Sequence, residues 1–153
     1  MSGNHSPTSL HNIELLTKEL GLEKIGRTSL FCREGLLVFS PAVAKNSQGY
    51  YWFDIREVNI ERKNEFSPSV CLLVVRIVPD QFIVCPFEQI QSICEAPKTE
   101  SSGKKKWEFL LVEGFTKIKN RHTDAAFVTY ALDSHAALKA IKGAAMATFR
   151  KRG

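Results

Sequence analysis

The chain has 153 residues, 44% of them hydrophobic and 24% charged, which is the size and composition of one soluble globular domain. It contains no apolar run of the roughly 18 residues that a membrane span needs, and residues 1–7 lack a secretory signal, so we expect a cytoplasmic protein without membrane partners. The formal net charge of +5 is uneven: residues 98–153 carry 12 Lys and Arg against 5 Asp and Glu, whereas residues 1–97 carry 9 against 11.

The first predicted element is an amphipathic helix that follows a flexible leader of residues 1–8. Thr8 or Ser9 would cap this helix, and Gly21 would end it. Its apolar residues recur at helical spacing, at Leu10, Ile13, Leu16 and Leu20. Such a stripe predicts that the helix docks on a sheet or, alternatively, on a partner helix.

Strand signals dominate the middle of the chain. A turn over residues 33–35, with Gly35 at its special position, separates the first two strands, and polar residues 61–68 and 95–106 read as loops. The almost continuous apolar run of residues 70–78 is typical of a strand that is covered on both faces. The predicted strands are residues 28–32, 36–40, 50–60, 70–78, 81–85, 107–112 and 127–132, with a basic, alternating segment at 115–121.

The end of the chain predicts a second long helix. A short helix is expected over residues 87–93, and Asp133 or Ser134 would cap a final helix that reaches Phe149 and leaves 150–153 as a basic tail. We therefore expect a single α+β domain over residues 9–149. Its mostly antiparallel or mixed central β-sheet would be flanked by an N-terminal and a C-terminal helix.

The aromatic segment that begins at Tyr50 has two different faces if it is a strand. By the period of two, one face carries Tyr51, Phe53, Ile55 and Glu57 and is the cleaner core face. The other face carries aromatic side chains at one end and charges at the other, in the order Tyr50, Trp52, Asp54 and Arg56. A Trp or Phe in a strand is more often core packing than a platform for stacked bases.

The basic last third of the chain indicates a polyanionic partner, for which we expect nucleic acid and in particular DNA. Clustered Lys and Arg side chains gain affinity for nucleic acid by releasing phosphate counterions. The predicted phosphate contacts are Lys104, Lys105, Lys106, Lys117, Lys119 and Arg121. The alternative is a solvated basic surface without a dedicated ligand, in which residues 104–106 are only a soluble loop tip.

The order helix, strand, strand, strand over residues 9–60 resembles the front half of the PD-(D/E)XK nuclease superfamily. On that resemblance, Asp54-Ile55-Arg56 lies where the family has acid-x-Lys, and Glu14 on the preceding helix is an accessory acid. The chain departs from the family pattern in two places, because residues 36–40 contain no acid and Arg56 replaces the usual Lys. The succession of aromatic and apolar strands over residues 50–112 also resembles that of domains found in restriction and mobile-element proteins.

The resemblance implies a Mg²⁺-dependent endonuclease of the restriction or homing type that cleaves phosphodiester bonds in DNA. Its implied catalytic residues are Asp54, Arg56 and Glu57, and its implied Mg²⁺ ligands are Asp54 and Glu14. Small nucleases of this kind often act as dimers, so a homodimer is one expectation. The alternative is a non-catalytic module that binds nucleic acid or protein, in which Asp54 and Arg56 form ordinary cross-strand ion pairs.

The four cysteines are predicted to be structural thiols. Their positions, 32, 71, 85 and 94, include no C-x-x-C pair and have no zinc-ligand spacing to the histidines. Cys71 and Cys85 lie inside predicted strands, where a free thiol behaves as a small buried hydrophobe.

Overall fold

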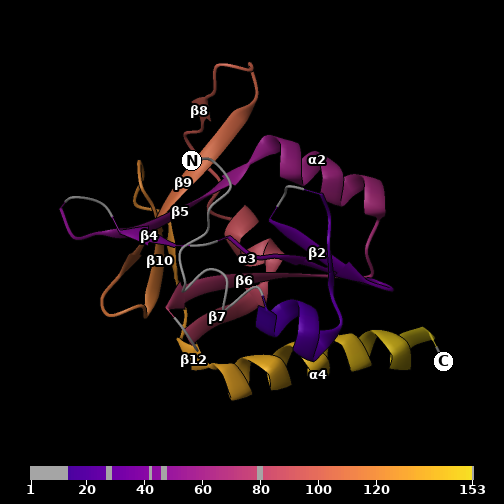
Figure 1. Cartoon of the computed structure of the whole chain (residues 1–153). Coiled ribbons are helices and arrows are strands. Elements are labelled where there is room, and N and C mark those ends of the chain that lie inside the picture. Colours follow the sequence, from indigo (N-terminus) through magenta and orange to yellow (C-terminus); the bar gives the residue numbers. More distant parts are fainter. Residues whose placement is uncertain (1–13, 27–28, 42, 46–47, 79–80, 153) are drawn as a thin grey trace.

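The structure is a computed structural model that describes residues 14–26, 29–41, 43–45, 48–78 and 81–152 (Figure 1). It confirms the α+β class, but its strands form two six-stranded sheets where one central sheet was expected. The helical elements are a π-helical turn η1 (Leu15–Glu19), α2 (Glu57–Phe66), α3 (Phe87–Gln91) and α4 (Ser134–Arg152). The predicted start of the first helix at Thr8 or Ser9 lies outside the described residues.

The first sheet, sheet A, is mixed. Its only parallel pair among the described strands is β3 with β6, and its other neighbours are antiparallel. Its strands, in spatial order, are β1 (Glu23–Lys24), β2 (Leu30–Arg33), β3 (Leu36–Phe39), β6 (Val70–Val78), β7 (Gln81–Pro86) and β12 (Leu132–Asp133).

The second sheet, sheet B, is antiparallel. Its strands, in spatial order, are β11 (Ala126–Val128), β10 (Lys117–Asn120), β9 (Lys105–Val112), β5 (Tyr51–Arg56) and β4 (Ala44–Lys45), with β8 (Lys98–Thr99) paired to β9. β8 falls in the segment 95–106 that was predicted as a loop. Hydrophobic alternation could not predict this strand, because β8 is only two residues long and both residues are exposed.

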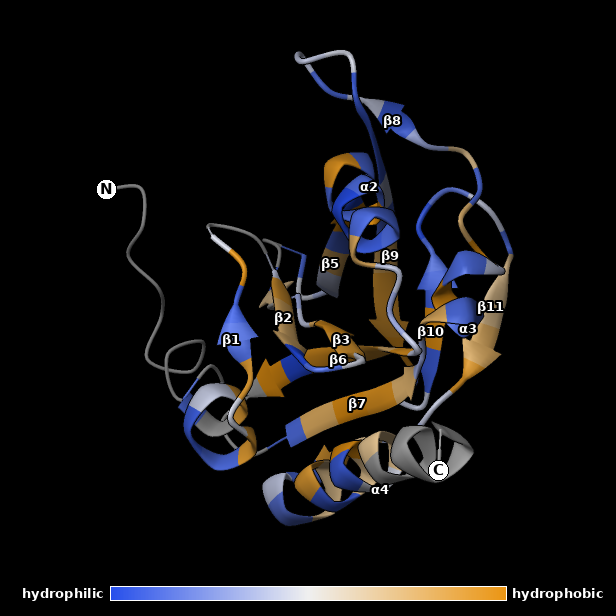
Figure 2. Ribbon diagram, turned by 90° about the vertical axis from the view of Figure 1, so that its right-hand side faces the viewer, coloured by the Kyte–Doolittle hydropathy of each residue, from blue (hydrophilic) through white to orange (hydrophobic). Residues whose placement is uncertain are grey.

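Two apolar clusters show that sheet A is buried on both faces, as the continuous apolar run of β6 predicted. On one face, Val74 and its neighbours pack with Leu16 and Leu20 of η1 and with Ile141 of α4. On the other face, Leu73 and its neighbours pack with α3 and with the inner side of sheet B, including Phe109. In Figure 2, α4 lies alongside β7 with the apolar strands of the core above it.

The aromatic strand ends at Arg56, four residues earlier than predicted, and continues directly as α2. Sequence periodicity missed this helix because it contains no buried residue, and Ile60 is its only hydrophobic side chain that packs partly against the core. Ser67 ends the helix in the left-handed conformation, and Pro68 follows. The charged residues of the predicted loop therefore belong to an exposed helix that covers one end of sheet B (Figure 1).

Two further predictions are corrected in detail. In the β2–β3 turn, Glu34 takes the left-handed backbone conformation (φ 54°) where Gly35 was expected to do so. The predicted strand 127–132 is divided between the sheets, because its first part is β11 in sheet B and its last residue begins β12 in sheet A. The chain crosses between the sheets here, and alternation along a sequence cannot show which sheet a strand joins.

A buried arginine holds another of the crossings, from β3 in sheet A to β4 in sheet B. Arg76 of β6 donates from Nε (3.0 Å) and Nη2 (2.6 Å) to the carbonyl oxygen of Ser40. Its backbone amide donates to Pro41 O, and its carbonyl accepts from the amide of Val43. Burial lowers the pKa of Arg76 to about 10, which leaves the guanidinium charged at neutral pH.

The final helix begins as predicted, with Asp133 as its cap. Asp133 Oδ1 accepts a hydrogen bond from the backbone amide of Ala136 at 2.8 Å. The helix runs to Arg152, so its backbone continues past the boundary expected at Phe149. No helix in the described part of the chain has the length and apolar character needed to cross a membrane.

Candidate nucleic-acid interface

Strand register sorts the side chains of sheet B onto two faces. Phe53 of β5 lies opposite Phe109 of β9, and their rings stack in the core with centroids 5.3 Å apart. Along each strand, the residues that alternate with these buried ones point away from sheet A and form what we call the outer face. It comprises Trp52, Asp54, Arg56, Lys98, Lys106, Glu108, Leu110, Val112, Lys117, Lys119, Arg121 and Val128.

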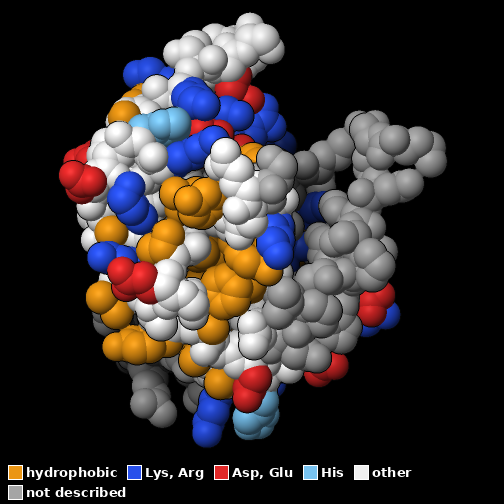
Figure 3. All heavy atoms as spheres, turned by 90° about the vertical axis from the view of Figure 1, so that its left-hand side faces the viewer, with side chains coloured by type: hydrophobic (Ala, Val, Ile, Leu, Met, Phe, Trp, Pro, Cys, Tyr) orange, Lys and Arg blue, Asp and Glu red, His pale blue; other side chains and the backbone are white. Residues whose placement is uncertain are grey.

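The outer face is ordered into bands along its strands. Trp52 lies opposite Leu110, and Leu110 lies opposite Lys119, which makes an apolar row ending in a cation. The next pair along is Asp54 opposite Glu108, and after it comes Arg56 opposite Lys106. Figure 3 shows this side of the molecule, where hydrophobic side chains gather in the middle and mixed basic and acidic side chains lie above them.

We call the rows formed by Asp54 with Glu108 and by Arg56 with Lys106 the charged band. Glu108 is its centre. It is only 5% exposed, and its carboxylate lies 3.1 Å from Lys98 Nζ, 3.4 Å from Arg121 Nη1 and 2.9 Å from His122 Nε2. Burial raises the pKa of Glu108, but the hydrogen bonds from His122 and Lys98 and the charges of Lys98 and Arg121 outweigh burial and hold it below its ordinary value. The carboxylate is therefore ionised at neutral pH and is held by three donors.

The turn that carries His122 is held in place by Asn120. Asn120 Nδ2 donates to the carbonyl oxygens of Ile93 and Glu95, both at 2.8 Å, and its Oδ1 accepts from the amide of His122. Since Asn120 is fully buried, these bonds anchor the β10–β11 turn to the segment that follows α3. Asn120 thus fixes the position of His122 beside Glu108 through the backbone of the segment that follows α3.

Asp54 is the second acid of the charged band. Burial raises its pKa, although the charges of Lys106 and Arg56 act in the opposite direction and those of Glu108 and Glu100 reinforce the rise. Asp54 and Glu108 are thus an acid pair on neighbouring strands with pKa values shifted in opposite directions. The partners of Glu108 account for the difference.

The predicted phosphate contacts divide between two regions. Lys117, Lys119 and Arg121 alternate along β10 and its end, so they share the outer face as the basic alternation of 115–121 suggested. Arg121 is paired with Glu108, and Lys119 Nζ donates to the carbonyl oxygens of Asn120 (3.1 Å) and Thr123 (2.7 Å).

Within the predicted triplet 104–106, only Lys106 belongs to the outer face. Lys104 Nζ pairs with Glu61 of α2 at 2.8 Å, and the amide of Lys105 donates to Glu57 Oε1 at 3.0 Å. Trp107, which follows these lysines in the chain, lies on the inner side and packs against the core. The aromatic side chain of the outer face is Trp52 instead.

The structure keeps the predicted catalytic residues Asp54 and Arg56 on one face of β5, but it does not bring the predicted metal ligand Glu14 to them. Arg56 pairs with Glu100 at 3.1 Å, and Glu57 is the first residue of α2. Glu14 lies at the start of η1, on the face of sheet A away from sheet B, so it and Asp54 are on opposite sides of sheet A. Among the described residues there is no group of three or more His, Cys, Asp or Glu side chains that could hold a metal ion.

Sequence reasoning missed Glu108, Lys98 and His122. The signal for Glu108 is present in the sequence, because it is the only acid in the apolar strand segment 107–112. Lys98 and His122 lie in polar segments without periodicity, and only the pairing of β8 with β9 and the β10–β11 turn bring them to Glu108.

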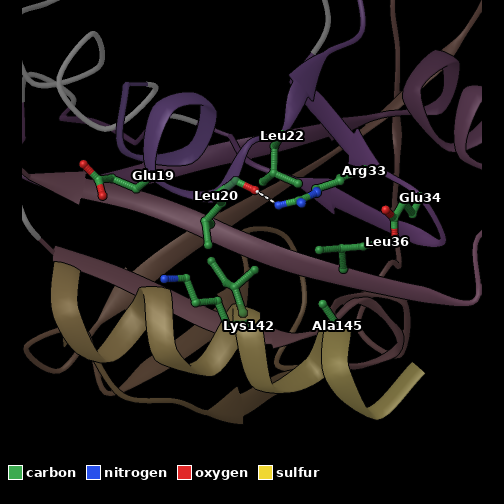
Figure 4. Close-up of a pocket in the computed structure, with 9 residues that line it drawn as sticks. Glu19, Leu20, Leu22, Arg33, Glu34, Leu36, Lys142 and Ala145 are labelled. Atoms are coloured by element: carbon green, nitrogen blue, oxygen red, sulfur yellow. Dashed lines mark hydrogen bonds between the residues drawn. The ribbon is translucent and has the colours of Figure 1, made fainter. Parts of the chain in front are cut away.

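A hollow of about 350 Å³ lies elsewhere, between η1, the β2–β3 turn and α4 (Figure 4). Its floor is apolar, and Arg33 Nη1 donates to Leu20 O at 2.9 Å across one side. It is on the far side of sheet A from the outer face of sheet B. Its lining residues are Glu19, Leu20, Leu22, Arg33, Glu34, Leu36, Ile141, Lys142 and Ala145.

The cysteines are free thiols inside or beside the apolar clusters. Burial raises the pKa of Cys85 to about 12 and that of Cys94 to about 11. Burial likewise raises the pKa of Cys71 to about 12, with Lys63 acting against it and Glu88 with it. Thiols with such pKa values are protonated and unreactive at neutral pH.

Comparison with known proteins finds no protein-family model, no curated protein and no solved structure that matches this chain.

Proposed function

We propose that the protein is a nucleic-acid-binding module whose binding surface is the outer face of sheet B. The observation that carries the proposal is the gathering of six Lys and Arg side chains on one sheet face beside Trp52. These cations are Arg56, Lys98, Lys106, Lys117, Lys119 and Arg121. Three carboxylates share the region, Asp54, Glu100 and Glu108, so the face keeps a positive excess.

The cations differ in how available they are to phosphate. Lys106 and Lys117 have no carboxylate within ion-pair distance in the described ranges, and Lys106 acts on Asp54 only through its longer-range charge. Arg56 and Lys98 are about half exposed and are each paired with a single carboxylate. The Arg56–Glu100 pair is partly exposed and therefore weak, so a phosphate can share Arg56 at little cost. Lys98 is less available, because its partner Glu108 is nearly buried.

The proposal is binding without cleavage. A metal-dependent nuclease needs carboxylate oxygens that are free to hold a hard cation. The oxygens of Glu108 are engaged by Lys98, Arg121 and His122, and the raised pKa of Asp54 reflects an acid that is already disfavoured as an anion. The resemblance to PD-(D/E)XK nucleases therefore supports nucleic acid as the ligand more than it supports cleavage of phosphodiester bonds.

The test is binding of fluorescein-labelled DNA and RNA oligonucleotides, followed by anisotropy between about 50 and 200 mM salt. We expect wild-type affinity to fall steeply as salt rises. The Lys106→Gln/Lys117→Gln double variant should bind at least about tenfold more weakly at low salt, with a salt slope shallower by about 1 for each lost contact.

The matched control is Lys139→Gln/Lys142→Gln, which removes the same charge from exposed positions on α4, on the far side of sheet A. This control should keep wild-type binding apart from a small loss of general attraction. The proposal fails if wild type shows no salt-dependent binding, or if the control weakens binding as much as the outer-face variant does.

A cleavage arm separates binding from catalysis. Wild type with Mg²⁺ should leave a supercoiled plasmid and a labelled single strand intact under conditions in which it binds them. Mg²⁺-dependent cleavage that Asp54→Asn abolishes, with binding unchanged, would contradict a purely binding function.

A further inference from the structure

The outer face of sheet B has a shape that discriminates between kinds of nucleic acid. Its five-strand path from β11 to β4 spans about 19 Å at the usual strand spacing of roughly 4.8 Å. The major groove of DNA is only about 12 Å wide and admits a helix or a two-stranded ribbon. The whole face is therefore too wide to lie flat in the major groove of B-form DNA, and a duplex lying across it would present mainly its phosphates.

Apolar and aromatic side chains occupy the part of the outer face that a duplex could not use. Trp52 and Leu110 are half-buried neighbours, and Val128 at the edge is 64% exposed. Tyr50 and Tyr130 follow the same alternation just beyond β5 and β11 and are 50% and 71% exposed. Phosphates do not use the flat faces of the aromatic rings, whereas unpaired bases stack on them.

Lysines lie within this apolar region as well as beside it. Lys117 is opposite Val112 and Val128, and Lys119 is opposite Leu110 and Ala126. Since alternate residues of a strand are about 6.8 Å apart, the two lysines form a short row of positive charge along β10. Cations alternating with stacking surfaces are the pattern by which proteins track a single strand, holding its backbone and its bases together.

We propose that the ligand is single-stranded nucleic acid, with a base stacked on Trp52 and phosphates held by Lys117, Lys119 and Lys106. This inference rests on the proposed function and narrows its ligand class. DNA and RNA single strands offer the same base faces and phosphates, so both are probes of the one proposal. Asp54 lies two residues from Trp52 on the same strand face, where its oxygens can accept from the amino groups of a stacked base.

The two tryptophans of the chain make a matched pair of reporters, because Trp52 is on the outer face and Trp107 is on the inner side. Trp107→Phe leaves Trp52 as the only tryptophan, and Trp52→Phe leaves Trp107. Each variant is titrated with a 20-nucleotide dT strand, a 20-nucleotide U strand and a 20-base-pair duplex at low salt. Circular dichroism of each variant confirms the fold before titration.

We expect a single strand to quench the emission of Trp52 in Trp107→Phe and to leave the emission of Trp107 in Trp52→Phe unchanged. Anisotropy should show the preferred single strand binding at least about tenfold more tightly than the duplex, and Trp52→Ala should lose about tenfold in affinity for it.

Three results would overturn the inference in distinguishable ways. If the duplex binds as tightly as the single strands and Trp52 is not quenched, the ligand class is wrong while the proposed function stands. If no probe binds with salt dependence, the proposed function fails as well. If Trp52 emission changes with protein concentration alone, the face is covered by a second copy of the chain rather than by nucleic acid.

Discussion

The two sheets differ in how many of their faces are covered. Sheet A is buried on both sides, by η1 and α4 on one and by α3 and sheet B on the other, and Leu73 and Val74 are both fully buried although they point in opposite directions. In sheet B, the adjacent residues Phe109 and Leu110 point to a buried face and to an open face. A sheet covered on both sides serves stability, whereas an open face is available for a ligand.

The largest expected effect comes from the inner face of sheet B. Phe109→Ala removes a fully buried ring that stacks on Phe53, so it should lower the free energy of unfolding by about 3–5 kcal/mol. Leu110→Ala, one residue further on but on the outer face, should cost about 1 kcal/mol. Urea unfolding of both variants measures the difference, and equal losses would show that the two faces are not distinct.

The second effect concerns the charged band. Glu108→Gln removes the charge that Lys98, Arg121 and His122 share, and should lower the free energy of unfolding at neutral pH by about 1–3 kcal/mol. The folded-state pKa of Glu108 lies below its unfolded value of about 4.3. As the pH falls below that value, the unfolded chain takes up the proton first, so the stabilisation is lost as the pH passes through the folded-state pKa.

Unfolding of wild type and Glu108→Gln from pH 7 to pH 3 checks this sign. The difference in free energy should be full at neutral pH and should shrink below about pH 4.3. A difference that stays constant with pH would mean that the carboxylate charge is not what stabilises the network.

A smaller effect on stability is expected at the end of η1, which covers one face of sheet A. Gly21 ends η1 with φ +67°, and a Cβ there would lie 3.2 Å from Arg33 Nη1. Gly21→Ala should therefore cost about 1–2 kcal/mol in thermal unfolding. Gly143→Ala is the control, because its helical position in α4 has open space around it and should stabilise by up to about 1 kcal/mol. Equal effects in both variants would contradict the strain assigned to Gly21.

The smallest effect is expected at Asp54, whose charge acts on the free energy of unfolding in the opposite direction to that of Glu108. The pKa of Asp54 is raised above its unfolded value, so its ionised form opposes folding at neutral pH and the opposition is relieved as the pH falls. Asp54→Asn should leave the free energy of unfolding unchanged or raise it by less than about 1 kcal/mol. A loss as large as that of Glu108→Gln would show that the two opposed acids play the same role.

The sequence predicted the covered parts of the fold better than the open ones. The apolar strand that becomes β6, the strand that becomes β7, the cap at Asp133 and the stop at Gly21 all carry local physical signals, and the structure confirms them. Helix α2 and strand β8 were missed because neither buries a side chain. The division of the strands into two sheets depends on pairing between residues far apart in the chain, which no local pattern encodes.

The candidate site shows the same limit. Alternation placed Trp52, Asp54 and Arg56 on one face, and placed Lys117 and Lys119 together, as the structure has them. It could not show that Trp107 turns to the core, that Glu14 lies across sheet A from Asp54, or that Glu108 gathers the nearby cations. These depend on register, on which layer an element joins and on loop closure.

The most direct test of the central claim is a residue-by-residue map of where nucleic acid binds, from the amide chemical shifts of the ¹⁵N-labelled chain during titration with a dT strand. We predict that the perturbed amides belong to β5, β9, β10 and β11 and that those of η1 and α4 stay unchanged. Perturbations confined to η1, the β2–β3 turn and α4 would contradict the account, because they would place the ligand on the opposite side of sheet A.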